Sequence, residues 1–281
     1  MSFRPGTVSK ILWHFTGGPL WCEATQKQLK ELKPAINGYN ALLSILDSKQ
    51  LRLGQYKEIV KVIVKEKRKY NLSLRKTETI KNYPVTLTSQ PVCCVADIPL
   101  QHISYHANRY GKIAIGFHRS AVIKAGFNPV MYTLENTELL NKIYEGYSKI
   151  DGIDVLSAKS ELEHLQGEID SVLADNDIDE SIDSSSVELE LDCIESCKES
   201  IEASYSHQLA YIKTFDESEF DSIYCEREWR STKPFNFSKD DIAMIILPRE
   251  QEGYNFYKKF LDEAKLPREV TVGSWEDLVE H

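Results

Sequence analysis

An acidic segment late in the chain is the feature that most constrains the fold. Residues 151–205 contain 17 Asp or Glu and 2 Lys or Arg, which gives this segment a net charge of −15. The whole chain carries −9, so the remainder sums to +6. A mildly basic body therefore carries a strongly acidic segment. The basic body suits an anionic ligand such as a dinucleotide, although solubility is the simpler explanation of the charge alone.

Helical patterns on both sides of a polar linker predict the form of this segment. Residues 156–174 repeat apolar side chains at helical spacing, and residues 187–215 resume a helical pattern. Between them, residues 175–186 are acidic and rich in serine, with little capacity to form a core. We predict a helical hairpin inserted at 151–215, with residues 1–150 and 216–281 forming the core.

The two flanking segments mix short apolar runs with helical patterns, which is typical of an α+β fold. The expected strands cover residues 8–16, 50–53, 84–98, 112–117, 129–134, 222–230, 242–248 and 268–273. The expected helices cover residues 22–34, 39–48, 98–111, 118–126, 135–150 and 249–265. Residues 56–70 stay ambiguous, because IVKVIV favours a strand whereas the Lys and Glu content favours a helix.

The strongest local signal for chemistry is the Glu-x-Glu of Glu226 and Glu228, in SIYCEREWR. If these residues form a strand, alternation puts both carboxylates on one face. One carboxylate beside a ribose can stabilise an oxocarbenium-like centre while a C–N glycosidic bond breaks. The second can orient or deprotonate an acceptor. On spacing alone, a solvated strand face with Glu–Arg pairs is the better interpretation.

Two further segments offer candidate binding residues. His14 and Thr16 lie at the end of the first expected strand and can donate hydrogen bonds to a ribose or phosphate. The helix at 98–111 carries Tyr105, His106 and Tyr110, which can form a wall of a nicotinamide pocket. The alternatives are a hydrogen-bonded structural histidine and ordinary core aromatics.

Several classes of protein find no support. The six cysteines are scattered and do not resemble a disulfide framework, and no His or Cys cluster completes a metal site, so we expect no metal. The chain contains no G-x-G-x-x-G, Walker A or G-x-S-x-G motif. It contains neither a signal-peptide pattern nor a membrane-spanning run, so we expect a cytoplasmic protein without membrane contact.

The order of the motifs resembles the abortive-phage-resistance AbiGi-like family. W-H-F-T comes first, a tyrosine-containing helix leads into IAIGF, and Y-C-E-R-E-W-R comes late. The order is also similar to a wider bacterial group that looks related to the ADP-ribosyltransferase fold. The resemblance covers about 8–135 and 220–272, and it implies a split mixed β-sheet with flanking helices and the acidic hairpin as an insertion.

The resemblance also implies roles for the candidate residues. Glu228 would be the catalytic carboxylate, Glu226 its partner, and His14 the residue that binds the ribose of NAD, the substrate. Tyr105, His106 or Tyr110 would stack on nicotinamide; here Tyr stands one residue earlier than in the family motif.

Two functions follow as hypotheses. The first is an NAD-dependent ADP-ribosyltransferase in anti-phage abortive infection, with a protein, a nucleic acid or water as acceptor. The second is a catalytically inactive, antitoxin-like module that binds a protein partner through the acidic segment 151–205. A nucleic-acid binder is a weaker third option, which the basic body permits.

Overall fold

The computed structural model describes residues 9–22, 24, 27–71, 76–135, 137–151, 153–176, 183–215, 217–219, 224–264, 266 and 270–279. The chain divides into two compact units. The first, here the sheet unit, comprises residues 1–57, 91–132 and 215–281. The second, here the arm unit, comprises residues 58–90 and 133–214. The arm unit thus contains the expected insertion at 151–215 almost entirely, together with two segments that the sequence assigns to the core.

A seven-stranded mixed sheet organises the sheet unit. Its order is β15-β14-β8-β1-β7-β12-β9. The bounds in that order are Thr271–Ser274, Ile242–Leu247, Ala114–His118, Ile11–Phe15, Cys93–Ala96, Glu228–Ser231 and Asn128–Pro129. Within the described residues of this sheet, neighbouring strands pair antiparallel, except β14 with β15, which pair parallel. The α+β class, the mixed sheet and its flanking helices are therefore confirmed.

Successive side chains of β1 point to opposite faces of the sheet, and an apolar core lies on each face. Leu12 belongs to the core that also contains side chains from α1 (Ala35–Ser48), α3 (Arg119–Lys124) and α8 (Phe256–Glu263). Trp13 belongs to the other core, with side chains from α2 (Ile103–Tyr110) and α9 (Trp275–Val279). The functional groups described below lie on the Trp13 face.

Three further two-stranded pairs are separate from this sheet and from the long β-hairpin described below. They are β2 (Pro19–Cys22) with β3 (Lys27–Leu32), β4 (Gln50–Leu51) with β13 (Phe235–Asn236), and β10 (Met131–Leu134) with β11 (Ile212–Phe215). The predicted helix at 22–34 is wrong, because pairing with β2 provides β3 with its backbone partners. A helix was predicted over 187–215, and the observed helix ends at Leu209. A helix was also predicted over 249–265, and the observed helix there, α8, is shorter.

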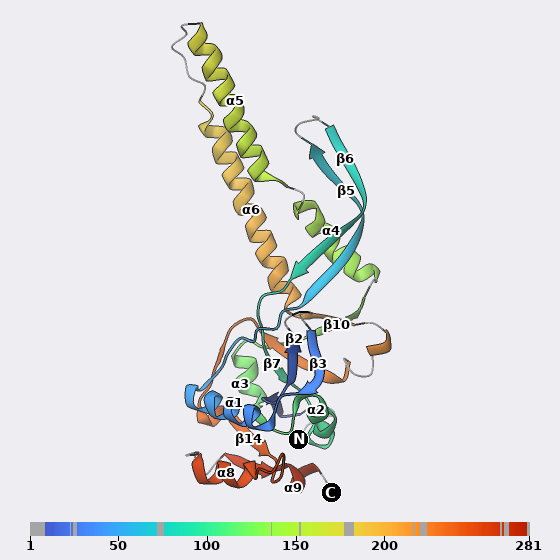
Figure 1. Cartoon of the computed structure of the whole chain (residues 1–281), viewed down its shortest axis with the longest axis vertical. Helices are drawn as coiled ribbons and strands as arrows, with labels where there is room; N and C mark the ends of the chain where they lie inside the picture. Colours follow the sequence, from blue (N-terminus) through green and yellow to red (C-terminus); the bar gives the residue numbers. More distant parts are fainter. Residues whose placement is uncertain are drawn as a thin grey trace. The chain divides into compact units, whose positions relative to one another are not determined.

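The arm unit combines a long β-hairpin with three helices (Figure 1). Strands β5 (Ile59–Asn71) and β6 (Lys76–Thr88) pair antiparallel, so the ambiguous segment 56–70 is mainly strand. The helices are α4 (Glu138–Asp151), α5 (Val155–Asp175) and α6 (Ser185–Leu209). Side chains of α4 and α6 bury one face of the hairpin base, where Val60, Val64, Val85 and Leu87 lie.

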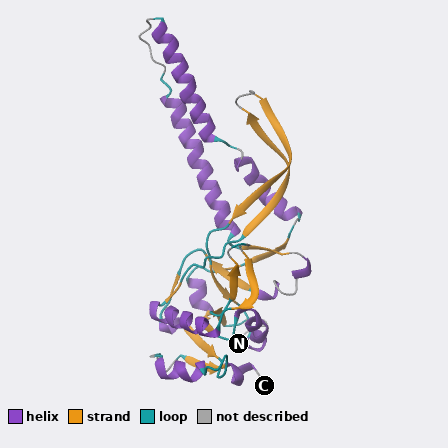
Figure 2. Cartoon of the chain, in the orientation of Figure 1, coloured by secondary structure: helices purple, strands orange, loops and turns teal. Residues whose placement is uncertain are grey.

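Helices α5 and α6 run side by side as a helical hairpin, which confirms the form predicted for the acidic segment (Figure 2). Lys159 of α5 contacts Asp192 and Glu195 of α6, each at 2.6 Å. Lys198 donates a hydrogen bond to the carbonyl of Ile153. Both lysines of the segment therefore make contacts within the hairpin or with a residue just before α5. The surface of the hairpin stays strongly acidic. Of the linker predicted at 175–186, residues 177–182 lie outside the described residues.

Candidate functional site

A cavity of about 810 Å³ opens in the sheet unit beside β12. Four segments line it: the end of β7 with the following turn, α2 with its preceding turn, the β9–β10 connection, and the residues that enter β12. The lining side chains that carry polar chemistry are Asp97, His102, Tyr105, His106, Tyr132, Cys225, Arg227 and Glu228. This volume lies within the range of small-molecule and cofactor sites.

Glu228 lies in the cavity wall, and its position is fixed by neighbours on both sides. It pairs with Ala96 of β7, and its backbone N–H donates to the Tyr132 hydroxyl at 2.8 Å. Nη2 of Arg230 lies 2.8 Å from Oε2 of Glu228, and the Arg230 side chain is fully buried. Burial and the Glu228 charge raise the pKa of Tyr132, which keeps its hydroxyl protonated. Glu228 is thus a carboxylate that its neighbours hold in place, with part of its surface open.

Glu226 is placed differently from Glu228, so the prediction that both carboxylates share one strand face is wrong. Tyr224–Glu226 form a 3-10 turn, and β12 begins only at Glu228. Arg227 between the two glutamates has φ of 44°, a left-handed conformation that interrupts the strand. The backbone N–H of Asp97 donates to the carbonyl of Arg227 at 3.0 Å, which ties this kink to β7.

Glu226 instead joins the entry of β12 to helix α2. Its side chain is buried, and its Oε1 accepts from the Tyr110 hydroxyl and from Nη1 of Arg109, each at 2.9 Å. Burial, followed by the nearby Glu226 carboxylate, raises the pKa of Tyr110. Glu226 and Tyr110 are not among the described residues that line the cavity. Their contact positions the helix that carries Tyr105 and His106.

Tyr105 and His106, the two nicotinamide-stacking candidates of adjacent sequence position, both line the cavity. Tyr105 is 53% exposed, whereas His106 is buried. The His106 ring lies 5.0 Å from the Phe15 ring and 4.6 Å from the Tyr110 ring, measured between centroids. Tyr105 is therefore the more exposed of the two rings at the cavity, and His106 is held in an aromatic cluster.

His14 and Thr16 do not reach the cavity. Register places Trp13 beside Ala96, and Ala96 beside Glu228, so Trp13 and Glu228 share a face of the sheet. His14 belongs to the opposite face, and its Nδ1 lies 2.9 Å from the carbonyl of Cys94. Thr16 follows β1 and bonds the carbonyl of Ile113. The expected ribose contact from His14 to a ligand beside Glu228 is thus not assembled in this structure.

The environment of His14 predicts a pH dependence of stability. Burial lowers the pKa of His14 from 6.5, partly offset by the hydrogen bond with Cys94. Between the folded value and 6.5 the unfolded chain binds more protons, so stability falls as pH decreases through this window. We expect His14→Gln to lose less stability than the wild type from about pH 7 to pH 5, measured by urea unfolding. Equal losses in both proteins would contradict this role.

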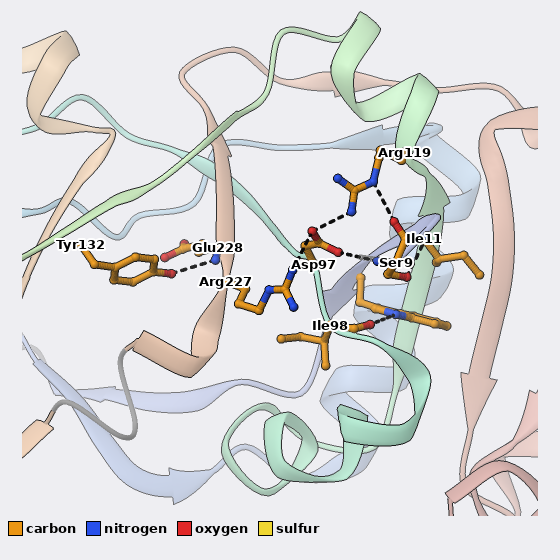
Figure 3. Close-up of polar contacts among 9 residues, drawn as sticks. Ser9, Ile11, Asp97, Ile98, Arg119, Tyr132, Arg227 and Glu228 are labelled. Atoms are coloured by element: carbon orange, nitrogen blue, oxygen red, sulfur yellow. Dashed lines mark hydrogen bonds and ion pairs between the residues drawn. The ribbon is translucent and has the colours of Figure 1, made fainter. Parts of the chain in front are cut away.

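Asp97 is the centre of a charged network that the sequence did not reveal (Figure 3). Its Oδ2 lies 2.6 Å from Nη2 of Arg119 and 3.3 Å from Nη2 of Arg227. The backbone N–H of Ser9 donates to its Oδ1 at 3.2 Å, and Nε of Arg119 donates to the Ser9 carbonyl at 2.7 Å. Asp97 therefore joins strands β7 and β1 to α3 and holds Arg227 at the cavity rim.

Residues 57–262 match the family model described as putative abortive phage resistance protein AbiGi, antitoxin. The chain belongs to this family. Over 72 residues it is 38% identical to the abortive phage resistance protein AbiGi of Lactococcus lactis subsp. cremoris, and this stretch covers 22% of this chain and 29% of that relative. The match thus spans less than a third of the relative. No solved structure matches the chain.

The AbiGi match bears on the candidate residues. The range 57–262 includes helix α2, Asp97, Glu226 and Glu228, whereas His14 and Thr16 precede it. The expected membership of an AbiGi-like family is confirmed. No helix in the described part of this AbiGi chain is long and apolar enough to cross a membrane.

Three residues of the site escaped the sequence analysis: Asp97, Tyr132 and Arg227. Asp97 and Tyr132 stand in or directly after apolar strand runs, where a polar residue is a signal in principle. Strict strand alternation would put Arg227 on the face opposite the glutamates, whereas in the structure it has a left-handed backbone conformation and lines the cavity together with Glu228. Among the described residues of this AbiGi chain, no group of three His, Cys, Asp or Glu is arranged to hold a metal ion.

Proposed function

We propose that this AbiGi-family chain acts in abortive phage resistance and that its cavity binds NAD beside Glu228 for ADP-ribosyl transfer. The observation that carries the proposal is a carboxylate held by Arg230 at the wall of a cavity of about 810 Å³. The exposed Tyr105 ring supplies a stacking surface there. Arg227 at the rim supplies a cation for the diphosphate.

The chemistry assigned to Glu228 is electrostatic. The bond between ribose C1′ and the nicotinamide nitrogen breaks, and its electron pair leaves with nicotinamide. The Glu228 carboxylate stabilises the positive charge that develops on the ribose. An acceptor nucleophile then bonds to C1′ and gives up its proton to solvent. Unlike the arrangement expected from the sequence, this site uses Arg227 and Tyr132 and makes no use of His14.

The test is Glu228→Gln, which keeps the side-chain shape and an oxygen for Arg230. We expect nicotinamide release to fall by about 10²–10³-fold, because one preorganised transition-state contact is removed. NAD affinity, measured by calorimetry, should change far less. The matched control is Glu250→Gln, an exposed site in the same unit. If the wild type neither binds NAD nor releases nicotinamide in extracts of infected and uninfected cells, the enzymatic proposal fails.

A second candidate function is an antitoxin that restrains a basic protein partner through α5 and α6. Two observations favour it: the family description includes the word antitoxin, and residues 151–205 carry a net charge of −15. Exposed apolar side chains lie among the charges, with Leu156 at 73% and Leu189 at 69%. Apolar side chains exposed among charges suit contact with a protein partner better than contact with solvent alone.

Deleting 163–190 tests the second candidate. The contacts of Lys159 with Asp192 and Glu195 set the register, so this deletion cuts both helices at about the same level and removes 13 residues of α5 and 6 of α6. The base of α6 that packs on the β-hairpin is retained. We expect the shortened chain to lose capture of its partner and control of that partner's toxicity, with the cavity unchanged. Unaltered control of toxicity would refute the candidate.

A further inference from the structure

The basic excess of the chain is concentrated in one β-hairpin that the proposed cavity does not use. Residues 59–88, which form β5, β6 and their connection, contain 8 Lys or Arg and 2 Asp or Glu, a net charge of +6. This equals the whole positive excess found outside the acidic segment. The remaining sequence is therefore close to neutral, and the hairpin is a localised polycation.

The hairpin has a packed base and an open outer part. Val60, Val64, Val85 and Leu87 are buried against α4 and α6 at the base. Beyond the pair of Val64 with Tyr83, we call residues 65–71 and 76–82 the outer ribbon. Among its described side chains, the exposed basic ones are Lys65, Arg68, Lys76 and Lys81. Lys67 is excluded from this set, because it is buried with its ammonium 3.7 Å from the Tyr83 ring centre.

The exposed cations occupy both faces of the outer ribbon. Arg68 pairs with Thr79, and Lys81 pairs with Glu66, so Arg68 and Lys81 lie on one face. Lys76 pairs with Asn71 and lies on the other face. Apart from the buried Lys67 and the half-buried Glu78, the described side chains of the outer ribbon are exposed. A two-stranded ribbon with so little packing is marginally stable alone, which favours a partner in the functional state. Because basic side chains lie on both faces, a partner that carries negative charge on either side of the ribbon fits best.

We propose that the outer ribbon binds duplex DNA by entering the major groove. That groove is about 12 Å wide and admits a two-stranded β-ribbon, with phosphates along both edges. Seven residues at a rise of about 3.3 Å give each strand of the ribbon roughly 23 Å, enough to follow part of a turn. Cations on both faces then meet both phosphate edges. Double-stranded RNA is a poorer fit, because its major groove is deep and narrow.

The test compares two variants of equal charge change by fluorescence anisotropy with a labelled 20-bp DNA duplex. The ribbon variant is Lys65→Gln, Arg68→Gln, Lys76→Gln and Lys81→Gln. The control variant neutralises three lysines and one arginine exposed in the sheet unit: Lys33, Arg52, Lys124 and Lys258, each to Gln. We expect the ribbon variant to bind at least about tenfold more weakly at 0.1 M salt. Its log–log salt slope should be shallower by about 3.6, because each of the four phosphate contacts contributes about 0.9, and the control should match the wild type.

Other outcomes distinguish the occupants of the ribbon. A charge-retaining variant, Lys65→Arg, Lys76→Arg and Lys81→Arg, should bind DNA like the wild type, which separates charge from misfolding. Absence of duplex binding by the wild type at 50 mM salt would overturn the proposal, as would equal weakening in the control variant. If the ribbon variant instead abolishes self-association in sedimentation experiments without DNA present, the occupant is the acidic hairpin of a second copy.

Discussion

Replacing Arg230 by Ala should lower the free energy of unfolding of the sheet unit by about 3–5 kcal/mol. Arg230 is fully buried, and its guanidinium lies 2.8 Å from the Glu228 carboxylate, which is itself only 14% exposed. Removing the cation leaves a largely desolvated carboxylate without this partner and opens a void beneath β12. All four tryptophans, at 13, 21, 229 and 275, belong to the sheet unit, so tryptophan fluorescence in urea reports its unfolding.

A double variant separates the charge effect from the loss of volume. Arg230→Met fills most of the space and still leaves Glu228 without its Arg230 partner, so it should remain destabilised. Adding Glu228→Gln removes the charge and should recover a large part of the loss, because a buried pair costs less to replace than to break. A change of under about 1 kcal/mol in Arg230→Ala would show that water or other groups satisfy Glu228. The same carboxylate would then be a weaker candidate for holding charge in a reaction.

Replacing Trp13 by Ala should destabilise the sheet unit by a similar amount, about 3–5 kcal/mol. Trp13 is 1% exposed in the centre of the sheet, and its indole Nε1–H donates to the carbonyl of Ile98 at 3.1 Å. The indole also lies directly over Gly116 of β8, where an added Cβ would approach Trp13 Cζ3 to 2.8 Å. Gly116 of the neighbouring strand thus leaves room for the indole ring. A smaller side chain in place of Trp13 would leave a cavity there.

Circular dichroism in urea measures this loss, because the substitution itself alters the fluorescence. Trp13→Phe should cost clearly less than Trp13→Ala, since it keeps most of the apolar volume and loses mainly the hydrogen bond. Leu261→Ala is the control, because Leu261 lies on α8 with 52% of its surface exposed. Its truncation should cost under about 1 kcal/mol. Comparable losses at both positions would mean that Trp13 is not a central core residue.

The candidate site was predicted in part. Glu228, Tyr105 and His106 were named from the sequence, and the structure places all three around one cavity. Glu226 and Tyr110 were also named, but they contact each other and are not among the described residues that line the cavity. Chain order was a useful guide here because short apolar strands, and a helix that ends at Gly111, are encoded locally. The roles proposed for these residues still depend on the ligand experiments.

The sequence by itself determined the acidic helical hairpin, the first strand, helix α2 and the AbiGi-like resemblance, because each depends on local periodicity, charge or motif order. Only the tertiary structure decided which side chains meet. The left-handed Arg227, tied to β7 through Asp97, separates Glu226 from Glu228. The register of β1 between its neighbours turns His14 away from Glu228. Both outcomes depend on hydrogen bonds between residues that are far apart in the chain, and a shift of one residue in a strand changes the face on which every side chain lies.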